Sequence, residues 1–142
     1  MTLVSQILQS KGNHTWTIAP NATVFDALTS MAEKDIGALL VIKNDEVVGI
    51  FSERDYARKI ILHGKSSKDT EVQEIMISEV LCISPDQSVN KCMALMTEKR
   101  IRHIPVLDNG RLVGVVSIGD VVKAIIAEQQ IIINHLEDYI YS

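Results

Sequence analysis

The sequence contains two copies of one pattern, separated by 65 residues with no gap. In each copy an apolar run ends in a serine, and an aspartate follows three residues later: residues 47–55 hold the first copy of this stretch and residues 112–120 the second. Identical residues at this offset include Ile18 and Ile83, Pro20 and Pro85, Val24 and Val89, Met31 and Met96, Val41 and Val106, Asn44 and Asn109, Gly49 and Gly114, Ser52 and Ser117, and Asp55 and Asp120. An internal repeat identifies the unit of folding. A long period that occurs only twice predicts two copies of a small α/β unit, not a solenoid.

Hydrophobic periodicity predicts the same order of elements in both copies, namely strand, helix, a hairpin of two strands, and helix. In the first copy these elements are expected at 15–18, 24–31, 36–42, 47–51 and from Glu53 to near Gly64. In the second they are expected at 80–83, 89–96, 101–107, 112–116 and from Ile118 onward. Thr23 and Ser88 are placed to cap the first helix of each copy. A further helix is predicted at 2–10, with Thr2 as N-cap and Gly12 at its end.

The chain therefore divides into an N-terminal helix and lead-in (1–14), a first repeat (15–63), a linker (64–79), a second repeat (80–127) and a C-terminal helix extension (128–142). One half alone is too small to be very stable, so we expect the halves to bury apolar surface against each other. The last helix carries an apolar stripe that continues to Ile140. This stripe exceeds what one half can cover and predicts packing on the N-terminal helix or on a second subunit, which would make a homodimer.

Composition excludes several classes of function. The net charge of −4 argues against non-specific nucleic-acid binding. No apolar run reaches the roughly 20 residues that span a bilayer, and the first residues lack the features of a signal peptide. Cys82 and Cys92 are expected to be free thiols, which suits a reducing cytoplasm.

The duplicated hairpin that ends in Val-Gly-aliphatic-aliphatic-Ser-x-x-Asp resembles a pair of CBS domains (the cystathionine β-synthase domain, or Bateman module). The resemblance covers about residues 15–63 and 80–127 plus the leading helix, and it is strongest for small stand-alone CBS-pair proteins. Its most specific stretches are 36–41, 52–56, 100–106 and 117–120. The resemblance implies an α+β, sandwich-like fold of two CBS repeats related by a pseudo-twofold axis. It also implies two clefts between the repeats, which in this family commonly bind AMP, ADP, ATP, NAD or S-adenosylmethionine.

Both serine–aspartate pairs lie where a strand enters a helix. A helix start has free N–H groups and the positive end of the helix dipole, so it favours an anion. Ser52 and Ser117 can donate a hydroxyl to a phosphate or a ribose. Asp55 and Asp120 accept hydrogen bonds only, so we expect them to bind the ribose 2′,3′-diol and to avoid phosphate.

The phosphates of such a ligand require cations. Arg54 and Arg58 are spaced to share one face of a regular helix, and Arg102 and His103 are expected to arrive from the other half. A planar guanidinium can hold a phosphate through two hydrogen bonds.

The family resemblance places the adenine against main-chain segments in each cleft. These segments are Thr17-Ile18 with Ala38-Leu39 in one cleft, and Cys82-Ile83 with Ile104-Pro105 in the other. Gly119 in the second copy lets a ligand approach the backbone closely. We therefore expect unequal sites, with the tighter one at Ser117 and Asp120.

Each of these residues also has a structural interpretation. The serine–aspartate pairs can be plain helix caps, which is compatible with a ribose site. Arg54 and Arg58 can be a solvated face, and Asp55 can pair with Lys59 on the helix. Arg102 and His103 can pair with Glu98 or Asp108.

The sequence contains no nucleophile–base pair, paired carboxylates, P-loop or metal-ligand spacing. It predicts a regulatory sensor, not an enzyme, with no metal and no catalytic cofactor. The expected partners are an adenosine-containing small molecule, a second copy of the chain and a regulated protein. The alternative is a protein–protein interaction scaffold whose clefts are vestigial.

Overall fold

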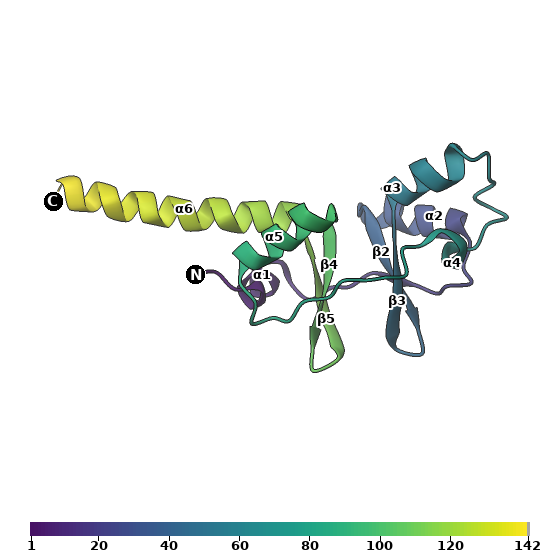
Figure 1. Ribbon diagram of the computed structural model, residues 1–142, viewed down its shortest axis with the longest axis horizontal. Helices are drawn as coiled ribbons and strands as arrows, with labels where there is room; N and C mark the ends of the chain where they lie inside the picture. Colours follow the sequence, from purple (N-terminus) through teal and green to yellow (C-terminus); the bar gives the residue numbers. More distant parts are fainter. Residues whose placement is uncertain (142) are drawn as a thin grey trace. The chain divides into compact units, whose positions relative to one another are not determined.

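The computed structural model describes residues 1–141, which form two compact units. Unit 1 combines Met1–His14 with the chain from Leu81 onward, and unit 2 is formed by Thr15–Val80. Figure 1 labels most of the helices and strands of the two units. The predicted α+β architecture, with a repeated unit, is confirmed.

Unit 2 is built on a three-stranded sheet in the order β1-β2-β3. Its elements are β1 (Thr17–Ile18), α2 (Val24–Lys34), β2 (Ala38–Lys43), β3 (Glu46–Ser52), α3 (Glu53–Asp55), a π-helix (Tyr56–Ile61) and α4 (Val72–Ile75). Strand β1 runs parallel to β2, and β3 runs antiparallel to it. The core lies between this sheet and the helices and contains Val24, Ala27, Met31, Leu39, Val41, Phe51, Ile60, Val72 and Ile75.

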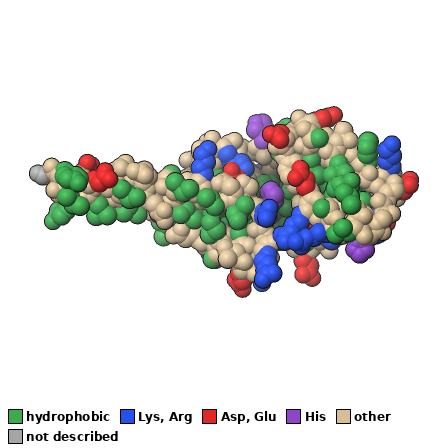
Figure 2. Space-filling model, turned by 90° about the horizontal axis from the view of Figure 1, so that it is seen from above, with side chains coloured by type: hydrophobic (Ala, Val, Ile, Leu, Met, Phe, Trp, Pro, Cys, Tyr) green, Lys and Arg blue, Asp and Glu red, His purple; other side chains and the backbone are tan. Residues whose placement is uncertain are grey.

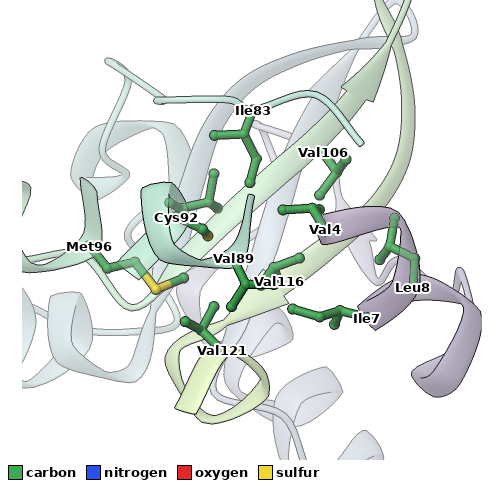
Figure 3. Packing of buried hydrophobic residues seen from close by; sticks show 11 residues of the cluster. Val4, Ile7, Leu8, Ile83, Val89, Cys92, Met96, Val106, Val116 and Val121 are labelled. Atoms are coloured by element: carbon green, nitrogen blue, oxygen red, sulfur yellow. The ribbon is translucent and has the colours of Figure 1, made fainter. Parts of the chain in front are cut away.

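Unit 1 has the same plan on a two-stranded antiparallel sheet. Its elements are α1 (Val4–Lys11), α5 (Val89–Lys99), β4 (His103–Asp108), β5 (Arg111–Ser117) and α6 (Ile118–Tyr141). The strand predicted at 80–83 is reduced to one parallel bridge between Ile83 and Val106. The buried residues of this unit face one another in Figure 3, where Val4, Ile7 and Leu8 of α1 meet Val106 and Val116 of the sheet.

Local sequence explains the turns and helix starts that the two repeats share. Both residues at each hairpin tip have positive φ: Asn44 (53°) and Asp45 (62°) in one, Asn109 (52°) and Gly110 (80°) in the other. This is the geometry of a type I′ turn, which matches the twist of the strands. The caps predicted at Thr23 and Ser88 are confirmed, because their hydroxyls accept hydrogen bonds from the N–H groups of Asp26 and Lys91.

Two local predictions are wrong. Leu3, not Thr2, is the N-cap of α1, and its N–H donates to Oε1 of Gln6 at 2.7 Å. The helix after Asp55 is a π-helix, in which each turn holds more residues than in an α-helix. Within it Ala57 and Ile61 are exposed, while Ile60 is buried.

The leading helices α1 and α4 are a second repeat, with an offset of 68 instead of 65 residues. Thr2, Val4 and Ile7 are identical to Thr70, Val72 and Ile75. Their main-chain contacts correspond as well: the N–H of Val4 donates to the Gln87 carbonyl at 2.9 Å, and that of Val72 to the Ala22 carbonyl at 2.8 Å. Each leading helix thus packs on the repeat that does not directly follow it. This exchange explains why unit 1 contains both ends of the chain.

The segment 64–79, expected to be a linker, contributes to the core of unit 2. It contains α4, whose Val72 and Ile75 are buried, and Ile77 pairs with Ile50 of β3. In the whole of the described chain, including the long helix α6, no helix has the length and apolar character needed to cross a membrane.

Close packing of each leading helix depends on a glycine in the return strand. A Cβ atom at Gly114 would lie 2.6 Å from Cδ2 of Leu8, which is too close for two carbon atoms. We predict that Gly114→Ala lowers the free energy of unfolding by about 1–3 kcal/mol, because buried Leu8 must move. The matched control is Gly37→Ala, where a Cβ would meet nothing within 4 Å. Urea unfolding followed by circular dichroism compares the two variants, and equal stability would contradict the packing argument.

Candidate functional site

Each serine–aspartate pair forms a reciprocal helix cap. Oδ2 of Asp55 accepts hydrogen bonds from the Ser52 N–H at 2.9 Å and the Ser52 hydroxyl at 3.0 Å, and the Asp55 N–H lies 3.3 Å from Ser52 Oγ. In unit 1, Oδ2 of Asp120 accepts from the Ser117 N–H at 2.8 Å, and the Asp120 N–H donates to Ser117 Oγ at 3.2 Å. The helix-cap interpretation is therefore correct for both pairs. It fixes the direction in which each carboxylate points.

In unit 2 the carboxylate is buried and its two oxygens have partners within the chain. Asp55 is 5% exposed, and Nζ of Lys59 lies 3.6 Å from its Oδ1. Lys59 also donates to the Ile75 carbonyl at 2.9 Å. The ion pair between Asp55 and Lys59, which the sequence left as an alternative, is present.

The neighbours of Ser52 are those expected from the hairpin. Ala38 lies opposite Ser52 across the β2–β3 pair, and the N–H of Glu53 donates to the Gly37 carbonyl at 3.1 Å. Leu39 contributes its side chain to the core and is 1% exposed. Thr17 and Ile18 lie on β1, opposite Leu40 and Val41 of β2.

In unit 1 a lysine that the sequence analysis did not select completes the site. Nζ of Lys11, at the end of α1, donates to Oδ2 of Asp120 at 2.7 Å and to the Val115 carbonyl at 3.0 Å. Lys11 reaches this position because α1 packs on β5 through the exchange of leading helices. The only sequence signal for it is the repeat of the leading helices, since 109 residues separate Lys11 from Asp120.

His103 lies beside the same carboxylate, opposite Ser117 across the β4–β5 pair. Burial lowers the pKa of His103 below its ordinary value, and the charges of Lys11 and Arg102 lower this pKa further, while Asp120 opposes them. These effects favour the neutral form of His103. The carboxylate whose charge affects the pKa of His103 is that of Asp120, not that of Glu98 or Asp108, the partners that the sequence had suggested.

Asp120 is ionised. Burial alone would raise the pKa of Asp120, but hydrogen bonds from Lys11 and Ser117 and the charge of Lys11 outweigh this effect. The pKa of Asp120 therefore lies below its ordinary value. A carboxylate that stays ionised is a strong hydrogen-bond acceptor across the physiological pH range.

The segment of unit 1 that was predicted to contact the base is tied to the sheet by its main chain. The Ile83 N–H donates to the Pro105 carbonyl at 3.0 Å, and the Ile83 carbonyl accepts from the Leu107 N–H at 2.8 Å. Ile83, Ile104 and Pro105 are buried. Cys82 is half-buried, and burial raises the pKa of its thiol.

The remaining candidates are exposed. Arg54 and Arg58 are on the surface of unit 2, and Arg102 and Gly119 are on the surface of unit 1. Arg54 lies in α3 and Arg58 in the π-helix that follows it, and their sharing of one face stays a prediction. The main-chain carbonyl of Arg102 accepts from the Ile118 N–H at 2.8 Å, which places this residue at the start of α6.

Comparison with known proteins gives a consistent result. The family model of the CBS domain matches residues 12–62 and 72–127. The CBS domain-containing protein CBSX3, mitochondrial, of Arabidopsis thaliana is 43% identical over 98% of this chain and 72% of its own length. A protein with CBS domains from Burkholderia ambifaria MC40-6 is 54% identical, with a TM-score of 0.87 over 90% of this chain and 96% of its own. The CBS domain pair of protein MJ0100, solved with 5′-methylthioadenosine and S-adenosyl-L-methionine, is 25% identical, with a TM-score of 0.78 over 90% of this chain and 98% of its own.

The ion pair between Lys11 and Asp120 generates a prediction about pH. Since the pKa of Asp120 is lowered in the folded protein, the ion pair contributes stability above the ordinary pKa of an aspartate, and this contribution is lost as the pH falls through the folded pKa. Replacement Lys11→Met should raise the pKa of Asp120 and remove this part of the acid sensitivity. NMR titration of the Asp120 carboxyl measures the shift. Lys91→Met, an exposed lysine of α5, is the control, and an equal pKa in both variants would contradict the role of Lys11.

Proposed function

This chain is a member of the CBS-domain family, with two CBS domains in tandem, and on that basis we propose that it is a sensor that binds an adenosine-containing ligand. CBS domain pairs are regulatory modules. The proposed ligands are AMP, ADP, ATP, NAD or S-adenosylmethionine, and the proposed sites are those of Asp120 in the second repeat and Asp55 in the first. The solved complex of the MJ0100 pair, which contains two adenosine derivatives, supports this class of ligand.

The geometry of Asp120 is the observation that carries the proposal. The hydrogen bonds from Lys11 and from the Ser117 N–H, and the ion pair with Lys11, all involve Oδ2 of its carboxylate. The side chain is 22% exposed. An ionised carboxylate with one oxygen held by the protein and the other available can accept hydrogen bonds from a ribose hydroxyl.

The charges around Asp120 suit a ligand with both hydroxyl and phosphate groups. Lys11 supplies a positive charge within the site, and Arg102 follows on the exposed side. The Ser117 N–H already binds Asp120, so a phosphate would depend mainly on these cations. We propose that Lys11 holds Asp120 in place when the site is empty and shares its charge with the ligand when the site is filled.

The site of the first repeat is proposed to be weaker. Asp55 is nearly buried, and both of its oxygens already interact with Ser52 or Lys59. A ribose would have to displace Lys59 from Oδ1. The repeats therefore share a motif but differ in how readily the carboxylate can accept a hydrogen bond from a ligand. This difference supports the expectation of unequal sites.

The wider setting of the sensor is part of the same proposal. We propose a homodimer, a regulated protein partner, no catalytic activity of its own, and no nucleic-acid or membrane partner. Cys82 and Cys92 are not joined in a disulfide, which favours a reducing compartment such as the cytoplasm. The Arabidopsis relative is named as mitochondrial.

Calorimetry with matched ligands tests the role of Asp120. We expect AMP to bind the wild-type protein roughly 10-fold or more tightly than 2′-deoxy-AMP, because one hydrogen bond to a charged group is lost. In Asp120→Asn the amide oxygen can still cap the helix, so the protein should fold while this preference for AMP disappears. Asp55→Asn is the control, which should leave the preference at the tighter site unchanged.

Two outcomes would contradict the proposal. One is the absence of binding by AMP, ATP, NAD and S-adenosylmethionine to the wild-type protein, which would favour the interaction scaffold. The other is an unchanged preference for AMP in Asp120→Asn.

A further inference from the structure

In both units a lysine connects the aspartate of the serine–aspartate pair to the leading helix. In unit 1, Lys11 is the last residue of α1, and its Nζ donates to Oδ2 of Asp120 at 2.7 Å. In unit 2, Nζ of Lys59 lies 3.6 Å from Oδ1 of Asp55 and donates at 2.9 Å to the carbonyl of Ile75, the last residue of α4. The aspartate, the lysine and the leading helix are therefore linked in each unit.

The two lysines come from different elements, although they make the same connection. Lys59 follows the aspartate by four residues, and the residue at the matching position of the second repeat is Ala124. Lys11 belongs to the leading helix, and the residue at the matching position after α4 is Glu79. Neither repeat can therefore use the lysine position of the other. Because the connection is made twice, from positions that do not correspond, it is not simply a product of the duplication and points to a shared role.

In unit 1 the ammonium group of Lys11 has a donor that can serve a ligand. An ammonium group has three N–H donors, and two of them bind Oδ2 of Asp120 at 2.7 Å and the Val115 carbonyl at 3.0 Å. The side chains of Lys11 and Asp120 are 36% and 22% exposed, so a ligand can reach both. Because the pair is partly buried, its charges are screened less than those of fully exposed groups.

Lys11 provides a polar contact at the end of α1. The start of the helix is held by its main chain, since the N–H of Val4 donates to the Gln87 carbonyl at 2.9 Å. The last turn packs through buried Leu8 and ends in Lys11. A helix of eight residues is not stable alone in water. The order of its last turn therefore depends on these side-chain contacts.

We propose that a ligand bound at Asp120 tightens the docking of α1 on its unit, and that Lys11 is the positioning residue that couples the two. The inference rests on the proposed function, because it requires a ligand whose ribose binds Asp120. The third N–H of Lys11 donates to a phosphate oxygen of this ligand, so the lysine is held by the aspartate, the Val115 carbonyl and the ligand together. The last turn of α1 then has one more contact in the filled site than in the empty one.

This coupling makes α1 the part of the unit that responds to the ligand. Coupling between two events is reciprocal, so a docked α1 raises the affinity for the ligand by the same factor by which the ligand favours docking. In unit 2 the connection acts in the opposite direction, because a ribose at Asp55 would have to displace Lys59, which also binds the Ile75 carbonyl of α4. The two sites therefore have opposite effects on their leading helices.

Hydrogen exchange of the full chain tests the inference. We expect saturating AMP to slow the amide exchange of residues 8–12, the last turn of α1 and its cap, about 5-fold more than it slows the exchange of α5 in the same unit. Adenosine has the same ribose but no phosphate, so it should slow both helices equally. Mass spectrometry of peptides from each helix measures the rates. Equal slowing of α1 and α5 by AMP, in a protein that binds AMP, would overturn the inference and leave the proposed function standing.

Variants of Lys11 show whether the coupling runs through this residue. In Lys11→Met the selective slowing of α1 by AMP should disappear, whereas Lys11→Arg should keep it, because arginine retains the charge and several N–H donors. Lys43→Met, at an exposed lysine of unit 2, is the control and should behave as the wild type. Circular dichroism shows that each variant is folded, and the wild-type comparison of AMP with adenosine needs no variant. Selective slowing that persists in Lys11→Met would overturn the role of Lys11.

Binding data separate this inference from the proposed function. Calorimetry that shows no binding of AMP, ATP, NAD or S-adenosylmethionine would overturn both. Binding of S-adenosylmethionine alone would support a sensor of adenosine-containing ligands but overturn the coupling, because that ligand has no phosphate for Lys11. If ATP or NAD binds more tightly than AMP, it replaces AMP in the exchange experiment, with the same expected result.

Discussion

The reciprocal cap between a serine and an aspartate is the interaction on which both the fold and the proposed site depend. A helix that begins directly at the end of a strand leaves its first N–H groups without main-chain partners. In each repeat the aspartate satisfies the serine N–H, and the serine hydroxyl accepts from the aspartate N–H. The cap thereby holds one carboxylate oxygen in a fixed place. The lysine contacts differ between the repeats. Lys59 lies beside Oδ1 of Asp55, the oxygen that the cap does not use, whereas Lys11 binds Oδ2 of Asp120, the same oxygen that the Ser117 N–H binds.

Much of the fold could be predicted because its signals are local. The hairpin turns are specified by Asn44-Asp45 and Asn109-Gly110, and two helix starts are specified by Thr23 and Ser88. The sequence of each repeat therefore indicates where its strands and helices begin and end. The exchange of the leading helices was not predicted. Its offset of 68 residues breaks the period of 65, and a search at the shorter period cannot align Val4 with Val72. The π-helix after Asp55 also escaped prediction, because the apolar spacing of Tyr56, Ile60 and Ile61 fits a regular helix as well.

The site was predicted in part for the same reason. Ser117 and His103 lie opposite each other on the paired strands β5 and β4, and Asp120 lies on the helix that follows β5. Their proximity therefore follows from the register of the hairpin. Lys11 belongs to a different element and reaches Asp120 only through the tertiary contact of α1 with β5. That contact requires a residue without a side chain at Gly114, where the main chain meets Leu8. The glycine that permits the leading helix to pack thus also brings the lysine to the carboxylate.

The two repeats differ most in the length of the helical segment that follows the serine–aspartate pair. The helical segment after Ser52 ends at Ile61, whereas the helix after Ser117 continues to Tyr141. Unit 2 closes its core without such an extension, and the core of unit 1 uses α6 only as far as Ile125. The later turns therefore contribute little to folding of the unit, yet they expose apolar side chains (Figure 2), among them Ile132 at 54%, Leu136 at 58% and Ile140 at 70%. Exposure of apolar surface to water is unfavourable, so the apolar residues beyond Ile125 are not explained by the folding of unit 1.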